Sequence, residues 1–165
     1  AWGVRAAARG AREVLCVDSS TTALEQAMAN ATLNGVGDRV RTEQGDAFEV
    51  LKSLREARER FDVVIVDPPA FIKRRKDFKE GALAYRRLNE MAMQVLERDG
   101  LLVSCSCSQL FSRDVLVHTL LQGSRHLDRN LLMLEQGRQG PDHPVLPAIP
   151  ETDYLKAIFA RVLPA

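Results

Sequence analysis

The chain alternates short β-branched, apolar runs with longer stretches of helical periodicity, and this pattern restricts its possible folds most strongly. The pattern is typical of an α/β protein, in which helices cover a mostly parallel sheet. Strands are predicted at residues 13–17, 39–44, 61–66, 100–106, 131–135 and 154–162. Helices are predicted at residues 1–9, 21–34, 46–59, 80–98 and 112–124, and a loop rich in Pro and Gly at residues 137–150.

Composition narrows the class further. With 165 residues, 45% hydrophobic and 27% charged, the chain is expected to form one folded domain. Its 23 basic and 22 acidic residues exclude a globally basic nucleic-acid binder and leave room only for a local patch. Three cysteines do not form a disulfide framework, so we expect a reducing, cytoplasmic setting. Neither a membrane span, nor a secretion signal, nor a metal-ligand cluster is indicated.

The first predicted helix, residues 1–9, is not preceded by a strand. In a doubly wound sheet, the first strand and its glycine-rich turn hold the cofactor at a helix N-terminus. We therefore expect a truncated domain that lacks the usual first strand, exposes two inner strand edges, and binds its cofactor poorly alone. Another segment, for example from a second copy in a homodimer, is expected to fill such a gap.

Three carboxylates, Asp18, Asp46 and Asp67, stand at or just after the C-terminal ends of predicted strands. Ligands bind at that edge in open α/β sheets. Asp18 is placed to accept hydrogen bonds from the hydroxyls of a ribose, and Asp46 to meet an adenine amino group, with Ala47 or Phe48 against the ring. The pair predicts a nucleoside cofactor. The alternative is that both residues only cap the helices that follow them.

Asp67 opens the sequence Asp67-Pro-Pro-Ala-Phe71, directly after a predicted buried strand. Pro68 and Pro69 stiffen the backbone there, so carbonyl groups and the Phe71 ring can be fixed against a planar base. The alternative is a rigid exit from the strand with a capping Asp.

Cys105 and Cys107 lie two residues apart, so both point to one face of their strand. Cys107 is nearer the C-terminal mouth and is the candidate nucleophile, although a small buried residue is the commonest role of a free Cys. Cys105 and Cys16 are predicted to be core residues.

A basic segment follows Phe71. It contains Lys73, Arg74, Arg75, Lys76 and Lys79, with one acidic residue among them. A phosphate-binding loop next to a base pocket suits an enzyme that modifies a nucleic acid. The alternative is an ordinary solvated face.

These motifs, in this order, resemble the class I S-adenosylmethionine (SAM) methyltransferases, and more narrowly the bacterial 23S rRNA 5-methylcytosine methyltransferases of the RlmI type. The matching segments are Val-Asp18-Ser-Ser, Gly45-Asp-Ala-Phe48, Asp62-Val-Val-Ile-Val-Asp67-Pro-Pro-Ala-Phe71, Tyr85-Arg-Arg-Leu-Asn89, Ser106-Cys-Ser108, Gln139-Gly-Pro-Asp-His-Pro144 and Tyr154-Leu-Lys156. They cover essentially the whole chain.

The resemblance implies a Rossmann-like class I methyltransferase sheet over residues 1–165, mostly parallel with an antiparallel C-terminal strand. It implies that SAM is held by Asp18, Ser19, Asp46, Ala47, Phe48 and Asp67. Cys107 and Asp67 would be catalytic, and Pro68, Pro69, Phe71, Lys73, Arg74, Arg75 and Lys76 would bind the RNA, in this family 23S rRNA. It also implies upstream RNA-binding modules that these residues do not include.

Three other functions stay open from sequence. A SAM enzyme that methylates a base nitrogen needs the Asp-Pro-Pro-aromatic loop and no thiol, so Cys107 separates it from a cytosine-5 enzyme. A noncatalytic nucleotide-binding or interaction domain is compatible with the missing glycine-rich turn. A nicotinamide dehydrogenase would be allowed by Asp18 alone.

Overall fold

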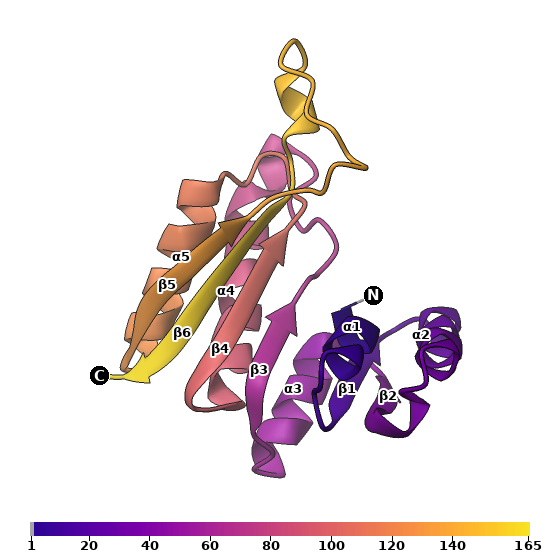
Figure 1. Ribbon diagram of the computed structural model, residues 1–165. Coiled ribbons are helices and arrows are strands. Elements are labelled where there is room, and N and C mark those ends of the chain that lie inside the picture. The colour runs from indigo at the N-terminus through magenta and orange to yellow at the C-terminus, as the bar shows by residue number, and fades with distance from the viewer. Residues whose placement is uncertain (1) are drawn as a thin grey trace. The chain divides into compact units, whose positions relative to one another are not determined.

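The computed structural model describes residues 2–165, which fall into two compact units divided between Ser53 and Leu54. Figure 1 shows both units with their helices and strands labelled. The first unit contains α1 (Trp2–Ala8), β1 (Val14–Asp18), α2 (Thr21–Leu33), η1 (Gly37–Arg39), β2 (Val40–Gln44) and the start of α3 (Ala47–Glu56). The second contains β3 (Phe61–Val66), η2 (Arg75–Asp77), α4 (Phe78–Gln94), β4 (Leu96–Ser106), α5 (Arg113–His126), β5 (Arg129–Gly137), η3 (Pro150–Thr152) and β6 (Lys156–Pro164).

The first unit is built on two parallel strands, β1 and β2, whose register runs from Val14 opposite Val40 to Asp18 opposite Gln44. A small apolar core forms where α1 and α2 pack on these strands, from Val4, Ala7, Ala31, Val36 and Val40, with Val14, Cys16 and Met28 against it. Gly10 and Gly35 follow the two helices with positive φ values of 103° and 67°, so each ends its helix as predicted.

The second unit is a four-stranded sheet in the order β3-β4-β6-β5. β3 and β4 are parallel, and β6 runs antiparallel to both β4 and β5. Figure 1 shows α4 and α5 behind the sheet on one face, where α4 contacts β3 and β4 and α5 contacts β5 and β6. The expected antiparallel C-terminal strand is therefore confirmed.

Side-chain alternation along β4 gives its two faces different roles. Leu102, Ser104 and Ser106 point toward the helices, since the Ser106 hydroxyl donates to Tyr85 of α4. Val103 and Cys105 point to the opposite face, where they pack with Ala157. The end of β4 therefore carries polar side chains directed into the helix layer.

β1 in the first unit and β3 in the second each lie at a sheet edge. Within residues 2–165, β1 is hydrogen-bonded to β2 alone and β3 to β4 alone. Each of these two strands therefore has one edge without a strand partner. No helix in this part of the chain is long and apolar enough to cross a membrane.

Two predicted helices end earlier than expected, the helix of residues 46–59 at Glu56 and the helix of residues 80–98 at Gln94. The helix expected to reach residue 98 stops at Gln94, and β4 begins at Leu96. The apolar spacing continues through Val95 and Leu96, but the Val95 carbonyl accepts a hydrogen bond from the Phe61 amide. Because residues 95 and 96 pair with β3, they form the start of a strand and do not continue the helix.

Candidate functional site

Asp18 and Asp46 lie next to each other at the carboxyl edge of the β1-β2 sheet. Asp18 ends β1, and its carbonyl accepts a hydrogen bond from the amide of Gly45, the residue before Asp46. Both side chains are exposed, as are Ser19 and Ala47, and Phe48 is half-buried. Adjacent parallel strands thus bring five predicted cofactor residues to one edge, as the sequence suggested.

Both carboxylates also stabilise the backbone that follows them. Asp18 Oδ1 accepts from the Ser20 amide at 2.8 Å, while Ser20 itself caps α2. Asp46 Oδ1 accepts from the amides of Phe48 and Glu49 at 2.9 and 3.3 Å, so Asp46 caps α3. In both residues these bonds reach Oδ1, and no bond from residues 2–165 reaches Oδ2. Capping therefore leaves one acceptor oxygen of each carboxylate available.

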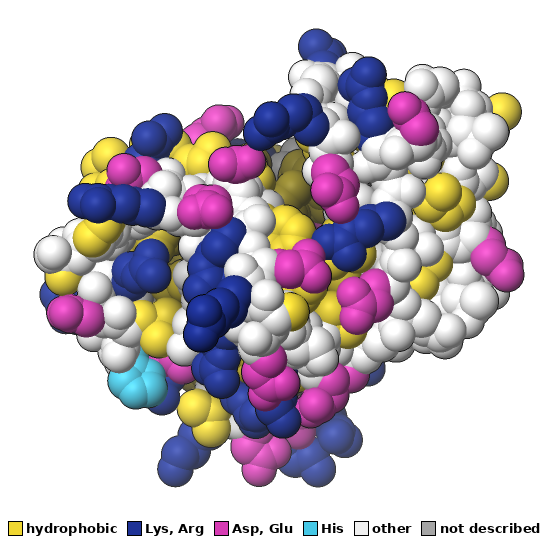
Figure 2. Space-filling view, turned by 90° about the horizontal axis from the view of Figure 1, so that it is seen from below, with side chains coloured by type: hydrophobic (Ala, Val, Ile, Leu, Met, Phe, Trp, Pro, Cys, Tyr) yellow, Lys and Arg dark blue, Asp and Glu magenta, His cyan; other side chains and the backbone are white. Residues whose placement is uncertain are grey.

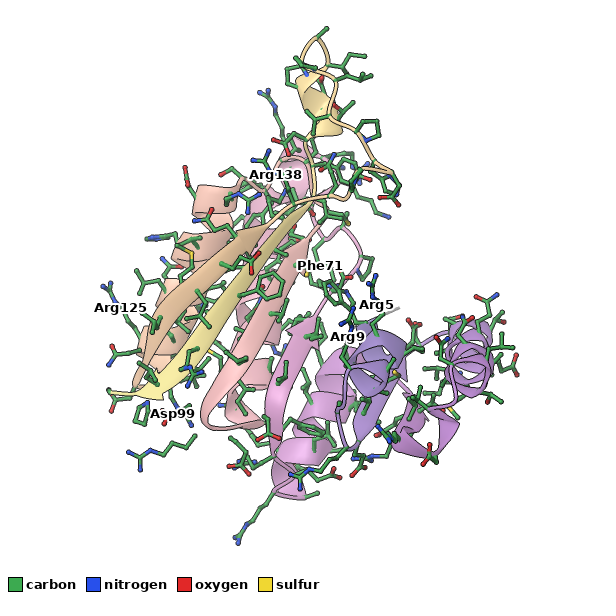
Figure 3. The ribbon with its side chains drawn as sticks, in the orientation of Figure 1. Arg5, Arg9, Phe71, Asp99, Arg125 and Arg138 are labelled. Atoms are coloured by element: carbon green, nitrogen blue, oxygen red, sulfur yellow. The ribbon has the colours of Figure 1, made fainter. Side chains whose placement is uncertain are left out.

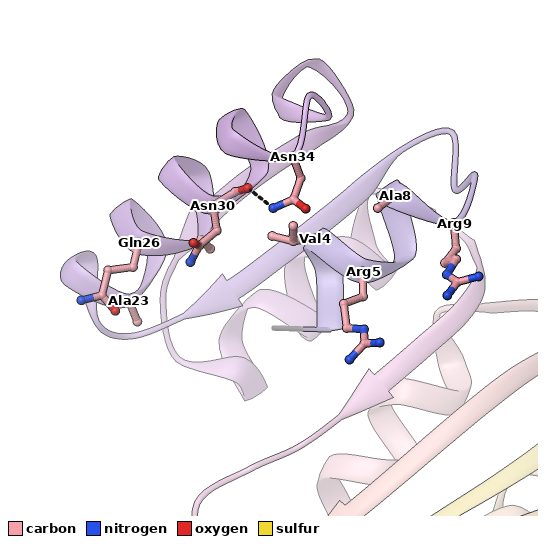
Figure 4. A pocket seen from close by; sticks show the side chains of 9 residues that line it. Val4, Arg5, Ala8, Arg9, Ala23, Gln26, Asn30 and Asn34 are labelled. Carbon is pink, nitrogen blue, oxygen red and sulfur yellow. Dashed lines mark hydrogen bonds between the residues drawn. The ribbon is translucent and has the colours of Figure 1, made fainter. Parts of the chain in front are cut away.

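The first unit also has a shallow pocket of about 590 Å³ between α1 and α2 (Figure 4). An Asn34 side-chain amide that donates to the Asn30 carbonyl lies at its wall. None of the predicted site residues lines it; the lining is Val4, Arg5, Ala8, Arg9, Ala23, Gln26, Ala27, Asn30 and Asn34.

In the second unit, Asp67 lies beside the cysteine-bearing end of β4. The parallel register pairs Val66 with Ser104, which places the next residue, Asp67, alongside Cys105. Burial raises the pKa of the Cys105 thiol to about 12, and the negative charge of Asp67 adds to the increase. The predicted catalytic carboxylate and the cysteine segment therefore come together at one sheet edge.

The three cysteines have different environments. Cys105 is buried among Val103 and Ala157, and Cys16 packs against the core of the first unit, where burial raises its pKa. Both were predicted to be core residues; this is confirmed for Cys105, whereas Cys16 is half-buried at the margin of its core. Cys107 lies one residue beyond β4 and is half-buried, and its thiol makes no hydrogen bond within the described chain. Of the two cysteines at this strand end, only Cys107 is partly accessible.

An aromatic stack supports the Pro-Pro-Phe segment. The ring centroids of Phe71 and Tyr85 lie 4.8 Å apart. Tyr85 also stacks on Phe111, with 4.5 Å between the ring centroids and an angle of 10° between the ring planes. Tyr85 and Phe111 are fully buried, whereas Phe71 is half-buried at the end of the row. Figure 3 shows Phe71 beyond the carboxyl end of β3. Pro68 is half-buried and Pro69 is exposed.

The basic segment leaves this loop and enters α4 through η2. Lys73, Arg74, Arg75 and Lys76 are all exposed. Arg74 pairs with Asp77 at 3.2 Å, which orients one guanidinium along the turn. The remaining cations extend into solvent on the same stretch of backbone.

Sequence reasoning missed the polar network beneath Cys107. The Tyr85 hydroxyl contacts the hydroxyls of Ser108 and Ser106 at 2.9 and 3.0 Å, and the Ile72 amide donates to the Ser108 hydroxyl at 3.2 Å. Lys156 Nζ donates to the carbonyls of Ser108 and Tyr154, both at 2.7 Å. Tyr85 and Lys156 belong to segments that resemble the methyltransferase family. That resemblance was the only feature of the sequence that could have indicated a role for them.

The sheet order and the acidic strand ends define a domain with the class I methyltransferase fold. One structure with this fold is described as "A putative sam-dependent methyltransferase from Streptococcus mutans". It matches this chain with a TM-score of 0.82 and 19% sequence identity. The match covers 96% of this chain and 40% of that one.

Residues 1–112 match the family described as "Conserved hypothetical protein 95", and the chain belongs to that family. It is 39% identical over 162 residues to a "Putative ribosomal RNA large subunit methyltransferase" of Methanocaldococcus jannaschii. It is 34% identical over 163 residues to the ribosomal RNA large subunit methyltransferase I of Erwinia tasmaniensis. Each match covers 98% of this chain and 41% of the relative, so the chain spans about two fifths of their length.

Proposed function

We propose that this chain forms part of the catalytic domain of a SAM-dependent methyltransferase that makes 5-methylcytosine in large-subunit ribosomal RNA, with Cys107 as nucleophile. The observation that carries the proposal is the half-buried Cys107 thiol just beyond the carboxyl end of β4, beside β3, which is followed by Asp67-Pro68-Pro69. The two relatives described above are named as rRNA large subunit methyltransferases, which supports the substrate class.

The carboxylates of the first unit fit a nucleoside cofactor. Asp18 and Asp46 are exposed and adjacent, and each keeps an oxygen that caps no helix. In this proposal Asp18 and Ser19 hold the ribose of SAM, Asp46 accepts from the adenine amino group, and Ala47 and Phe48 contact the ring. When bound, SAM supplies an electrophilic methyl group.

Cytosine carbon 5 is a weak nucleophile, so the ring must first be activated. The Cys107 thiolate adds to carbon 6, forming a sulfur–carbon bond and shifting the ring double-bond electrons toward N3 and carbon 5. A proton shared between the Asp67 carboxyl group and N3 neutralises the negative charge that develops at N3, and it returns to Asp67 when the ring double bond is restored. After carbon 5 gains its methyl group, loss of the carbon 5 proton to a base restores the double bond and expels the Cys107 thiolate.

The loop beyond Asp67 is assigned to RNA binding. Pro68, Pro69 and the half-buried Phe71 offer a stiff, partly aromatic surface for the target base. Lys73, Arg74, Arg75 and Lys76 are exposed on the adjoining stretch, where they would contact phosphates.

Replacement of Cys107 by Ala tests the nucleophile. In the intact enzyme, Cys107→Ala should reduce formation of 5-methylcytosine in rRNA to background while SAM affinity is retained, because the thiol is needed only for activation of the ring. Cys105→Ala is the matched control, two residues away in the core, and should keep most of the activity. Nucleoside analysis by mass spectrometry identifies the product.

Each alternative gives a different result in the same experiment. Unchanged 5-methylcytosine formation by Cys107→Ala would show that the nucleophile is assigned wrongly. A product methylated on a base nitrogen would favour the nitrogen methyltransferase. Binding of RNA without any methylated product from the unaltered protein would favour a noncatalytic domain.

A further inference from the structure

Lys156 is a buried cation at the first position of β6. Its side chain is almost fully enclosed, with 6% of the residue exposed, and it forms no ion pair with a carboxylate in residues 2–165. Burial lowers the pKa of the Lys156 ammonium, Arg113 adds to this effect, and the charges of Cys107 and Asp153 oppose it. Burial of an ammonium without a carboxylate partner costs stability. The contacts of Lys156 must therefore explain why a lysine is buried here.

The ammonium is directed at the segment that carries Cys107. Antiparallel pairing sets Lys156 opposite Ser106, and Lys156 Nζ donates to the Ser108 carbonyl at 2.7 Å. A second bond, also 2.7 Å, goes to the Tyr154 carbonyl. These bonds use two of the three N–H groups of the ammonium. Lys156 therefore ties the residue after Cys107 to the start of β6.

A second set of hydrogen bonds holds the two residues that flank Cys107. The Ser108 amide donates to the Ser106 hydroxyl at 3.2 Å, and both hydroxyls contact the Tyr85 hydroxyl. Ser106, Ser108 and Tyr85 are all fully buried. The residues before and after Cys107 are thus both held by hydrogen bonds, while its own thiol stays half-buried and outside this network.

We propose that Lys156 is the positioning residue for Cys107: its ammonium holds the carbonyl of the next residue, Ser108, and supplies a positive charge close to the thiolate. The proposal deepens the function proposed above, since it rests on Cys107 as the nucleophile. A positive charge close to the sulfur stabilises the thiolate both before addition to the base and after its release.

Alkylation of Cys107 measures this charge without RNA or SAM. Iodoacetate is an anion and iodoacetamide is neutral, so the ratio of their rate constants reports the local potential at the sulfur. In the full chain, Lys156→Met should lower this ratio at Cys107 by about tenfold, the effect of one nearby charge in a partly screened environment. Arg161→Met, which removes an exposed charge five residues further along the same strand, should leave the ratio unchanged.

Two internal thiols control for folding. Peptide mapping by mass spectrometry follows each cysteine separately; Cys16 should keep its ratio, and buried Cys105 should stay protected in every folded variant. Lys156→Arg retains the charge and should restore the ratio toward that of the unaltered protein. Added salt should lower the ratio at Cys107 in the unaltered protein, a measurement that depends on no variant.

The outcomes separate this inference from the proposed function. A ratio that is unaffected by Lys156→Met and by salt would overturn the role of Lys156, whatever the activity of Cys107→Ala. A lower ratio together with a reduced kcat and an unchanged KM for RNA would support it. If Cys107→Ala keeps full activity, the proposed function fails even where the Lys156 charge is measured at the thiol.

Discussion

Cys105 shows how one side chain at this site links stability to pH. Burial and the Asp67 charge raise the pKa of its thiol to about 12, from 9.0 for an unperturbed thiol. A group whose pKa is raised by folding stabilises the native state fully below its unfolded pKa. For Cys105 this contribution is present below about pH 9 and is lost progressively as the pH rises toward about 12.

The loss of unfolding free energy caused by Cys105→Ala should therefore become smaller as the pH rises. The difference in unfolding free energy between the unaltered protein and Cys105→Ala should narrow above about pH 9, by up to about 1.4 kcal/mol per pH unit. Urea unfolding at a series of alkaline pH values measures it. Val103→Ala truncates a neighbour in the same cluster and carries no titrating group, so its difference should stay constant. A constant difference for both variants would contradict the expectation.

At the level of elements, α4 supports the loop that follows β3. Gly81 is buried in the first turns of α4, and a Cβ at that position would collide with the Ile72 side chain and lie 3.0 Å from the Phe71 carbonyl oxygen. Ile72 is itself buried, with 2% exposed. The close approach of α4 to Phe71 and Ile72 therefore fixes the exit of the Asp67-Pro-Pro loop.

Gly81→Ala should lower the unfolding free energy by about 1–3 kcal/mol, because the added methyl group overpacks a buried contact. Gly123 in α5 is the matched control. A Cβ there would lie 3.0 Å from Glu90 Cγ, a wider contact than the one with Ile72 at Gly81, and alanine has a higher helix propensity than glycine. Gly123→Ala should thus change stability by less than about 1 kcal/mol. Denaturant titration measures the unfolding free energy of both variants. A larger loss in Gly123→Ala than in Gly81→Ala would refute this account of α4.

The elements that sequence predicted well are those defined by local pattern. The strand at residues 61–66 was predicted to the residue, because a β-branched run is bounded there by Asp67 and Pro68. The helix expected to reach residue 98 was predicted four residues too long, since its end depends on pairing with Phe61, far away in sequence. Lys156 contacts a carbonyl 48 positions earlier, and no local spacing encodes that bond.

For the whole molecule, charge is balanced in total and uneven along the chain. The net charge is +1, and on the face seen in Figure 2 basic and acidic side chains are interspersed. Lys73 to Lys76 are four consecutive exposed cations beside the loop after Asp67. RNA affinity is therefore expected to depend on where cations lie and much less on how many there are.

Two sets of variants that remove the same number of charges test this expectation. The triple variant Lys73→Gln, Arg75→Gln, Lys76→Gln should weaken RNA binding and reduce the slope of log affinity against log salt by about 2, since each phosphate contact to a single strand contributes about 0.7. The control triple, Arg125→Gln, Arg129→Gln, Arg161→Gln, lies on α5, β5 and β6 and should leave the slope unchanged. Fluorescence anisotropy at low and physiological salt measures both. Equal losses in the two triples would mean that net charge alone governs RNA binding, and unchanged slopes in both would make the basic segment an ordinary solvated face.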